Sequence, residues 1–289
     1  MKTILITGIN GFLGSNLAKW LSGVYKIIGI VNSFANLNRL SGYTIPIFLS
    51  DTKSLESVFR ENNIDVIIHT ATVYGKKNEA ITQIVNSNIM LPIKLMELAN
   101  AYKLELFINT DSFFNRTGPN YNYLNEYTLS KKHVLEWLRI MRFSGSLINM
   151  KLFHVYGPND APNKFIPEMI EKLKNNYDII ELTPGNQIRD FIFIDDVCSA
   201  FEFVLRKKND EKTKFLEIEI GLGIGLSIKE FLIKLKDIIG SNTRLKFGAL
   251  EYRDNELMYA VADTTFIRGL GWEPKTDINN GLHKIVNNR

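Results

Sequence analysis

Residues 7–14, TGINGFLG, place three glycines at every third position directly after a short apolar run. Residues 2–7 are aliphatic or β-branched, as in a strand, and residues 12–22 have the apolar spacing of a helix. Glycines at a strand-to-helix turn allow backbone N–H groups to approach a pyrophosphate at the positive end of the helix dipole. The alternative is that the glycines serve only a tight turn. The turn residues that we expect to bind a dinucleotide are Gly8, Asn10, Gly11, Phe12, Leu13 and Gly14.

Apolar runs and helical patterns alternate outward from this turn over the first half of the chain. The predicted strands are residues 2–7, 26–31, 45–49, 64–69, 104–109 and 147–153, and the predicted helices are 12–22, 52–61, 79–102 and 123–143. Strands that are apolar on both faces and alternate with helices indicate a parallel sheet covered on both sides. We therefore predict an α/β fold with a Rossmann-type doubly wound parallel sheet.

The rhythm changes after HVYGP, residues 154–158, to shorter elements that include a helix near 164–175 and strands near 179–183 and 188–194. We expect a dinucleotide-binding domain over residues 1–160, rejoined by about 188–206, and a smaller C-terminal substrate-binding α/β lobe over residues 161–289.

Composition excludes several classes of protein. The 289 residues are 45% hydrophobic, with no apolar run long enough to span a bilayer, and the N-terminus lacks a signal-peptide pattern. The only cysteine, Cys198, rules out an internal disulfide, and no Cys/His cluster has zinc spacing. The net charge of +4 comes from interleaved residues of both signs rather than from basic blocks. We expect a cytoplasmic protein with no metal, no nucleic-acid partner and no membrane partner.

The sequence YTLSK places Tyr127 and Lys131 four residues apart on a predicted helix, so their side chains share one face. A nearby ammonium favours the phenolate and can lower a tyrosine pKa from about 10 by one to three units. Tyr127 would then exchange a proton near neutral pH. The simpler interpretation is a surface tyrosine beside a solvated lysine, but a strand end that carries Thr110 precedes the pair and favours catalysis.

Taken in order, these motifs resemble the extended short-chain dehydrogenases/reductases that act on nucleotide sugars. The residues that carry the resemblance are the glycine triplet, Asn88 in NSNIMLPIKLMELA, Thr110, Tyr127 with Lys131, HVYGP, RDFIFIDDV (189–197) and LGWEP (270–274). The resemblance implies NAD or NADP on the first lobe and a nucleoside-diphosphate sugar on the second. It also implies that Thr110 binds the sugar C4 oxygen, Tyr127 moves the C4 hydroxyl proton and Lys131 holds the nicotinamide ribose. The further positions that it implies for the dinucleotide are Asn32, Ser33, Arg39, Asp51, Thr52, Ala71, Thr72 and Asn88.

Within this family the chain is most similar to CDP-abequose and CDP-paratose synthases, which reduce the 4-keto group of a CDP-linked 3,6-dideoxyhexose. The stretches that carry this similarity are NTDSFF (109–114), ATVYGKKNEA (71–80), NKFIP (163–167), QIRDFIF (187–193) and FGALEYRDNELMYAVAD (247–263).

One departure concerns the residues after Thr110. The family's dehydratases have an Asp-Glu pair there, with the Glu as the base that removes the C5 proton, whereas this chain has Asp111 and Ser112. A serine is no base for that proton, so dehydration is disfavoured. We expect Asp111 and Ser112 at the substrate site, with Asp111 either hydrogen-bonded to the substrate or capping the loop.

A second departure concerns the cofactor. NAD enzymes place a carboxylate on the adenosine ribose about 20 residues after the glycine turn, and this chain has Asn32 there. Ser33, Asn38 or Arg39 could bind a 2′-phosphate, so NADPH is favoured and NAD stays the alternative. A dissociable NADPH suits net reduction.

The resemblance also assigns residues to the substrate lobe. It places Arg189 and Arg253 on the substrate diphosphate, His154 beside it, and Lys164 and Phe165 at the phosphate and base. Helices 79–102 and 123–143 form a dimer interface in this family, so a homodimer is expected. The leading hypothesis is an NADPH-dependent nucleotide-sugar 4-ketoreductase for surface polysaccharide synthesis. The alternatives are an epimerase with retained NAD and a non-catalytic dinucleotide-binding regulator.

Overall fold

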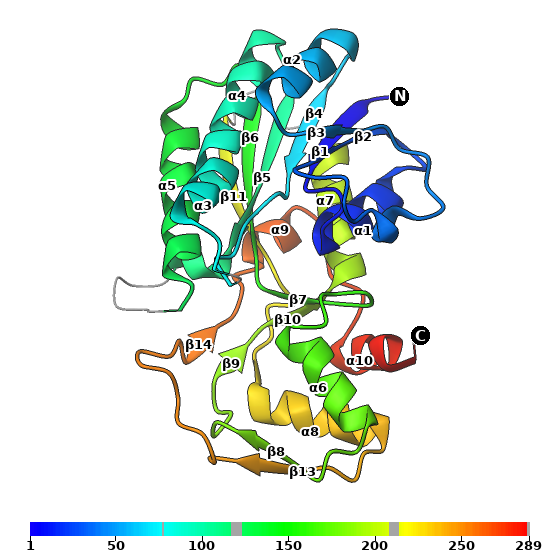
Figure 1. Cartoon of the computed structure of the whole chain (residues 1–289), viewed down its shortest axis with the longest axis vertical. Coiled ribbons are helices and arrows are strands. Elements are labelled where there is room, and N and C mark those ends of the chain that lie inside the picture. Colours follow the sequence, from blue (N-terminus) through cyan, green and yellow to red (C-terminus); the bar gives the residue numbers. More distant parts are fainter. Residues whose placement is uncertain (77, 117–122, 208–213, 288–289) are drawn as a thin grey trace. The chain divides into compact units, whose positions relative to one another are not determined.

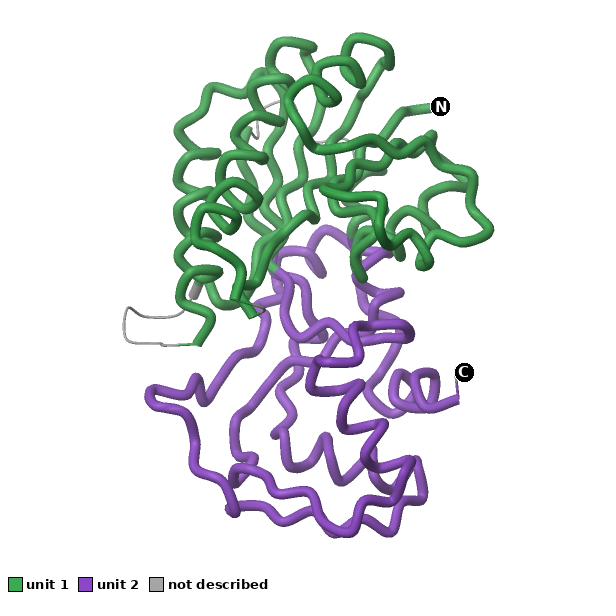
Figure 2. The backbone as a smooth tube through the Cα atoms, viewed as in Figure 1, with its two compact units in different colours: residues 1–116, 123–151, 201–218 green, residues 117–122, 152–200, 219–289 purple. Residues whose placement is uncertain are grey.

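The chain forms two compact units, coloured separately in Figure 2. The computed structural model describes residues 1–76, 78–116, 123–207 and 214–287, so Lys77 of the stretch 71–80 lies outside the described residues. Unit 1 comprises Met1–Arg116, Tyr123–Lys151 and Phe201–Ile218, and unit 2 includes Leu152–Ala200 and Glu219–Arg289.

A seven-stranded sheet with the order β11-β6-β5-β4-β1-β2-β3 runs through unit 1 (Figure 1). Its strands are β1 (Thr3–Thr7), β2 (Lys26–Val31), β3 (Ile47–Leu49), β4 (Val66–His69), β5 (Leu106–Ser112), β6 (Ser146–Leu152) and β11 (Phe215–Ile220). The pairings from β3 through β2, β1 and β4 to β5 are parallel. The strand order reverses between β1 and β4, which is where a doubly wound sheet binds its ligand. The predicted Rossmann-type fold is confirmed.

Helices cover both faces of this sheet, which is why its central strands are largely apolar. The helical elements along this part of the chain are α1 (Phe12–Leu21), η1 (Asn38–Leu40), α2 (Thr52–Glu61), α3 (Ile81–Val85), η2 (Asn86–Met90), α4 (Leu91–Ala101), η3 (Phe113–Arg116), α5 (Asn125–Ile140) and α7 (Ile194–Arg206). One core cluster joins Phe59 of α2, Leu95 of α4 and Val134 of α5 to Leu5 and Phe107 of the sheet. All five residues of β1 are buried, so the opposite face is covered as well.

The structure differs from the sequence prediction in three elements. The predicted helix 79–102 is a continuous helical run interrupted by the π-helical segment η2, which contains Asn88. The predicted strand 188–194 is two strands, β9 (Ile188–Arg189) and β10 (Phe191–Phe193). The strand β11 was not predicted, although it completes the main sheet.

Unit 2 is built from short strands and four helices among its described residues. Its remaining strands are β7 (His154–Tyr156), β8 (Ile179–Leu182), β12 (Leu226–Ser227), β13 (Arg244–Phe247) and β14 (Tyr259–Ala260), and its helices besides part of α7 are α6 (Phe165–Lys174), α8 (Ile228–Ile239), α9 (Thr265–Gly269) and α10 (Ile278–Asn287). They pair as β10 with β7, β12-β9-β14, and β13 with β8. Among the described helices, none has both the length and the apolar character that a bilayer crossing requires.

Two carboxylates of the stretch 189–197 hold unit 2 together. Asp190 is fully buried and accepts hydrogen bonds from the backbone N–H groups of Leu222 (2.8 Å), Gly223 (2.9 Å) and Ala262 (3.2 Å). Asp196 accepts hydrogen bonds from the backbone of residues 275 and 276, directly after LGWEP. The packing of unit 2 therefore gives both motifs a structural role.

Candidate active site

The glycine turn after β1 packs too tightly for side chains at two of its three positions. A Cβ on Gly8, which has a φ of +64°, would lie 2.7 Å from the Ala71 Cα atom, and one on Gly14 would lie 2.3 Å from the Gly8 carbonyl oxygen. Packing of the turn therefore accounts for Gly8 and Gly14. Gly11 is less constrained, because its Cβ would meet only the Gly8 oxygen at 3.0 Å. It is the N-cap of α1 and offers no side-chain cap, so the start of this helix suits a phosphate.

The segment after β2 lies beside the glycine turn. The Arg39 Nη1 atom donates a hydrogen bond to the Asn10 carbonyl oxygen over 3.3 Å, and the Asn10 Nδ2 atom donates to the Asn36 carbonyl oxygen over 3.2 Å. Asn32 and Ser33 are exposed on the same segment. A guanidinium is thus within hydrogen-bond distance of the turn predicted to bind phosphate.

Asp51 and Asn88, two further predicted cofactor residues, have structural partners. Asp51 caps α2, which begins at Thr52, and accepts hydrogen bonds from the Ser54 backbone (3.0 Å) and side chain (2.6 Å). Asn88 is buried and bonds to both backbone groups of Val73 (2.7 and 2.8 Å).

The loop after β4 is hydrogen-bonded to β1 and to Asn88. Ala71 donates its backbone N–H to the Thr7 side chain over 3.2 Å, and the Thr72 hydroxyl donates to the Asn88 Oδ1 atom over 3.3 Å. The Asn88 Nδ2 atom also donates to the Ser130 hydroxyl on α5 over 2.9 Å. Asn88 therefore links this loop to the helix that carries Tyr127 and Lys131.

The three predicted catalytic residues lie together at the end of β5 and the start of α5. The Lys131 Nζ atom donates to the Thr110 carbonyl oxygen over 2.8 Å and lies 5.8 Å from the centroid of the Tyr127 ring. All three residues are buried. The Thr110 hydroxyl is also buried and has no hydrogen-bond partner in the described part of the chain, so it can donate to a substrate oxygen. The Ser112 side chain lies near enough to the Tyr127 hydroxyl to act on its pKa.

Burial controls protonation at this site. Burial, with smaller contributions from Tyr74 and Asp111, raises the pKa of Tyr127 well above its ordinary value of 10, although the hydrogen bond from Ser112 acts in the opposite direction. The sequence-based prediction of a lowered pKa for Tyr127 is therefore wrong: Lys131 faces the ring and the Thr110 carbonyl rather than the hydroxyl. Burial also lowers the pKa of Lys131 to about 8, while Asp111 opposes that shift. Nearby His69 has its pKa lowered to about 3 by burial and by the Lys131 charge, so it is neutral.

Tyr74 belongs to this site and was not among the predicted residues. Its ring stacks on the ring of Tyr127 with centroids 4.8 Å apart, and Phe114 contacts Tyr127 edge-on at 6.2 Å. Tyr74 is 39% exposed, so its ring reaches the surface. Its place on the loop after β4, within the stretch 71–80, was the only signal available in the sequence.

The predicted diphosphate residues lie in unit 2. Arg189 is buried on β9 and pairs with Glu256, with an Nη2 to Oε1 distance of 2.7 Å. Burial and the charge of Arg189 lower the pKa of His154 to about 3, so this imidazole is neutral. Arg253 is exposed, and its carbonyl oxygen accepts a hydrogen bond from the Glu256 backbone over 3.1 Å. No local pattern predicted that Glu256 would pair with Arg189.

Lys164 and Phe165 lie at the start of α6 in the same unit. The Lys164 Nζ atom is 2.9 Å from an Asp160 carboxylate oxygen, and the Phe165 side chain is 40% exposed. The structure thus groups Thr110, Ser112, Tyr127 and Lys131 in unit 1, and Arg189 with His154 in unit 2.

Comparison with known proteins identifies the family. The model of the NAD dependent epimerase/dehydratase family matches residues 4–221. The chain belongs to this family. It is therefore an enzyme of a nicotinamide-dependent family, and the resemblance stated from the sequence is confirmed.

The relatives of this family member include two CDP-abequose synthases. The protein from Salmonella typhimurium is 35% identical, over 98% of this chain and 97% of the relative, and the one from Salmonella muenchen is 34% identical, over 99% and 97%. Among solved structures, UDP-glucose 4-epimerase from Thermotoga maritima superposes with a TM-score of 0.85 at 21% identity, covering 98% of this chain and 97% of that one. The solved structure supports the fold.

Proposed function

We propose that this enzyme reduces the 4-keto group of a nucleoside-diphosphate deoxy sugar, with NADPH as the hydride donor, for the synthesis of a surface polysaccharide. The observation that carries the proposal is Ser112, the last residue of β5 and close to Tyr127, at the position where the family's dehydratases have a glutamate. A hydroxyl there cannot serve as the base for dehydration. The identity of 34–35% to CDP-abequose synthases supports the same conclusion.

The protonation state of Tyr127 favours reduction over oxidation. Burial raises the pKa of Tyr127, so the neutral phenol predominates at physiological pH. A phenol can give its proton to the alkoxide that forms as a ketone is reduced, whereas oxidation of a sugar hydroxyl first requires the phenolate. In the proposed reaction the unpartnered Thr110 hydroxyl donates a hydrogen bond to the C4 oxygen, and Tyr127 then protonates that oxygen.

The chain's residues fit a dinucleotide. The uncapped start of α1 at Gly11 would hold the pyrophosphate, and Lys131 would hold the nicotinamide ribose. Arg39, hydrogen-bonded to the glycine turn, would meet a 2′-phosphate, and Asn32 avoids the repulsion that a carboxylate would exert on it. When bound, the dihydronicotinamide supplies the hydride.

The nucleotide sugar would occupy unit 2, in the proposed lobe over residues 161–289. Arg189 and Arg253 would bind its diphosphate with charge-assisted hydrogen bonds, and Lys164 would add a third cation. Because Arg189 is paired with Glu256 in a buried site, the diphosphate would compete with this carboxylate for the guanidinium. The exposed ring of Phe165 would stack on the base.

The purified enzyme, mixed with NADPH and a CDP-4-keto-3,6-dideoxyhexose, is expected to consume NADPH and form the 4-hydroxy sugar in equal amounts. NADPH consumption is followed by absorbance and the sugar product by mass spectrometry.

Arg39→Ala is expected to weaken the preference for NADPH over NADH by about tenfold or more, since one charge-assisted contact is lost. Arg60→Ala, which removes an exposed arginine of α2, is the matched control. Tightly retained NAD, with interconversion of C4 epimers and no NADPH consumption, would establish the epimerase alternative instead.

We also propose a homodimer built on α3 and α5. Exposed apolar side chains lie on these neighbouring helices: Ile81 (67% exposed), Leu129 (52%), Trp137 (51%) and Ile140 (70%). The last three recur at helical spacing along one side of α5. Light scattering after size-exclusion chromatography is expected to give twice the chain mass of 33.1 kDa. Ile140→Glu should give the monomer mass, whereas Ile224→Glu, which changes an equally exposed isoleucine of unit 2, should leave the dimer intact.

A further inference from the structure

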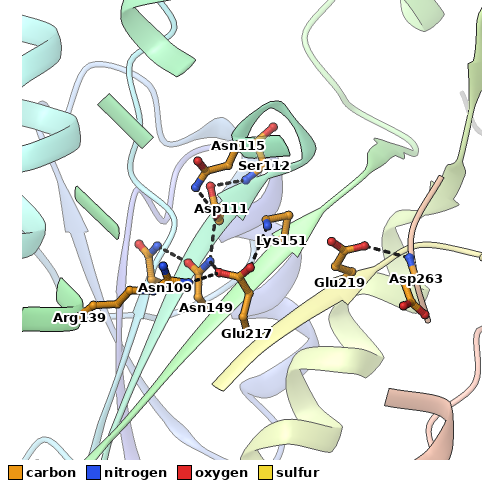
Figure 3. A network of polar contacts seen from close by, with 10 residues as sticks. All are labelled: Asn109, Asp111, Ser112, Asn115, Arg139, Asn149, Lys151, Glu217, Glu219 and Asp263. Atoms are coloured by element: carbon orange, nitrogen blue, oxygen red, sulfur yellow. Dashed lines mark hydrogen bonds and ion pairs between the residues drawn. The ribbon is translucent and has the colours of Figure 1, made fainter. Parts of the chain in front are cut away.

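Asp111 is a carboxylate that the structure keeps inside the protein. It lies between Thr110 and Ser112 at the end of β5 and is only 2% exposed. Its oxygens accept hydrogen bonds from the Ser112 backbone (2.7 Å), the Asn115 Nδ2 atom (2.8 Å) and the Asn149 Nδ2 atom (2.9 Å), as Figure 3 shows. These three donors hold the carboxylate in one orientation.

The donor Asn149 is itself fixed from three sides. It lies on β6, is fully buried, and accepts a hydrogen bond from the Asn109 Nδ2 atom over 2.7 Å. Its Nδ2 atom also donates to the Glu217 Oε2 atom of β11 over 3.1 Å, and Lys151 donates to the other oxygen of Glu217 over 2.9 Å. Strands β5, β6 and β11 thus contribute to one polar network, in which Asn149 cannot turn away from Asp111 without losing other bonds (Figure 3).

We propose that Asp111 is a positioning residue rather than a proton donor: Asn149 and Asn115 hold its carboxylate inside unit 1, where it fixes the end of β5 that bears Ser112 and supplies a buried anion near Lys131. This inference rests on the proposed function, since it assigns a role within the same reaction. Held in this way, Asp111 does not reach the substrate as an acid. It acts through Ser112 and Lys131.

The role of the Asp111 carboxylate follows from the charges around Lys131. The groups that act on Lys131 from the adjoining elements are Asp111 on β5, the neutral His69 on β4 and the neutral Tyr127 on α5. Asp111 is the anion of this group. Burial lowers the pKa of Lys131 to about 8 and Asp111 opposes that effect, so the carboxylate helps to keep the ammonium at neutral pH.

The test is Asp111→Asn, which keeps the shape of the side chain and removes its charge. Without the Asp111 charge the pKa of Lys131 should fall. The alkaline limb of the pH profile of kcat/KM is therefore expected to move to lower pH by about one unit, and kcat at the optimum pH to fall about tenfold. NADPH affinity, measured by its fluorescence between pH 6 and 10, should shift in the same direction without any sugar substrate. Asp65→Asn is the matched control, because Asp65 accepts a backbone hydrogen bond from Thr3 in the same unit.

The tether is tested separately with Asn115→Ala, which leaves the charge and removes one donor from a half-buried loop residue. A lower kcat with an unchanged alkaline limb is expected, so this variant still tests the tether if Asp111→Asn does not fold, and wild-type kcat in Asn115→Ala would contradict the tether. Loss of all turnover in Asp111→Asn with a wild-type NADPH-binding profile would show a proton donor and overturn the proposal. If Asp111→Asn leaves the pH profiles of both kcat/KM and NADPH binding unchanged, the proposal is overturned as well. If the wild-type enzyme reduces no 4-keto sugar, the proposed function fails, while NADPH binding still decides the role of Asp111.

Discussion

Tyr127→Phe is expected to lower kcat for ketone reduction by about 10²–10⁴-fold, the range for loss of a positioned acid. The substitution removes only the hydroxyl, and the ring keeps its stacking partner Tyr74 and its edge contact with Phe114. Fold and NADPH affinity should therefore change little. Stopped-flow absorbance of NADPH under single-turnover conditions measures the chemical step itself.

Tyr74→Phe is the matched control for this variant. It removes a hydroxyl from the ring stacked on Tyr127 and leaves the proposed proton donor in place. Because the proposed proton transfer does not use the Tyr74 hydroxyl, this variant should retain turnover within a few-fold of the wild-type enzyme. Wild-type turnover in Tyr127→Phe would contradict the proposed chemistry, and equal losses in the two variants would point to ring packing instead.

The sequence allowed the main fold to be predicted because its signals are local. The strand before Gly8 and the helix that begins at Phe12 are each indicated by patterns within about ten residues. The close approach of Gly8 to Ala71 shows why a glycine is needed there. Asp51 was likewise predictable as a cap, since the bond to Ser54 spans three residues. Local patterns of this kind need no knowledge of tertiary structure.

The partners of Asp111 could not be predicted in the same way. Asn149 lies 38 residues after Asp111 in the sequence, and Glu217 lies 68 residues after Asn149. The pairing of their strands depends on the whole sheet. The one sign of Asn149 in the sequence was that it and Lys151 are polar residues inside the mainly apolar run 147–153. The strand that carries Glu217 was not predicted at all, so its carboxylate had no predicted position.

The direction of the Tyr127 pKa was missed for a related reason. Spacing along α5 correctly placed Lys131 on the same face as Tyr127, but it carried no information about burial or about the Thr110 carbonyl that accepts the ammonium. Desolvation raises the pKa of Tyr127 more than the Lys131 ammonium, which is directed at the Thr110 carbonyl, can lower it. In unit 2 the ion pair of Arg189 with Glu256 joins residues 67 positions apart and was beyond local patterns too.

Thr110→Val is expected to change activity and stability in opposite directions. The Thr110 hydroxyl is buried without a partner in the described part of the chain, and an unsatisfied buried polar group costs about 1–3 kcal/mol. Valine has nearly the same shape, so the free energy of unfolding should rise by about 1 kcal/mol. Turnover should fall by about 10²–10³-fold, because one donor to the developing oxyanion is lost. Denaturant titration and the ketoreductase assay measure the two effects.

Thr128→Val separates the catalytic effect from the packing effect. Thr128 follows Tyr127 on α5, and its hydroxyl is also buried with no partner among the described residues. The free energy of unfolding should therefore rise by a similar amount, while turnover stays near that of the wild-type enzyme. If both variants gain stability and only Thr110→Val loses turnover, the Thr110 hydroxyl is reserved for the substrate at the expense of stability. A loss of stability in Thr110→Val without a loss of turnover would show that this hydroxyl serves the fold instead.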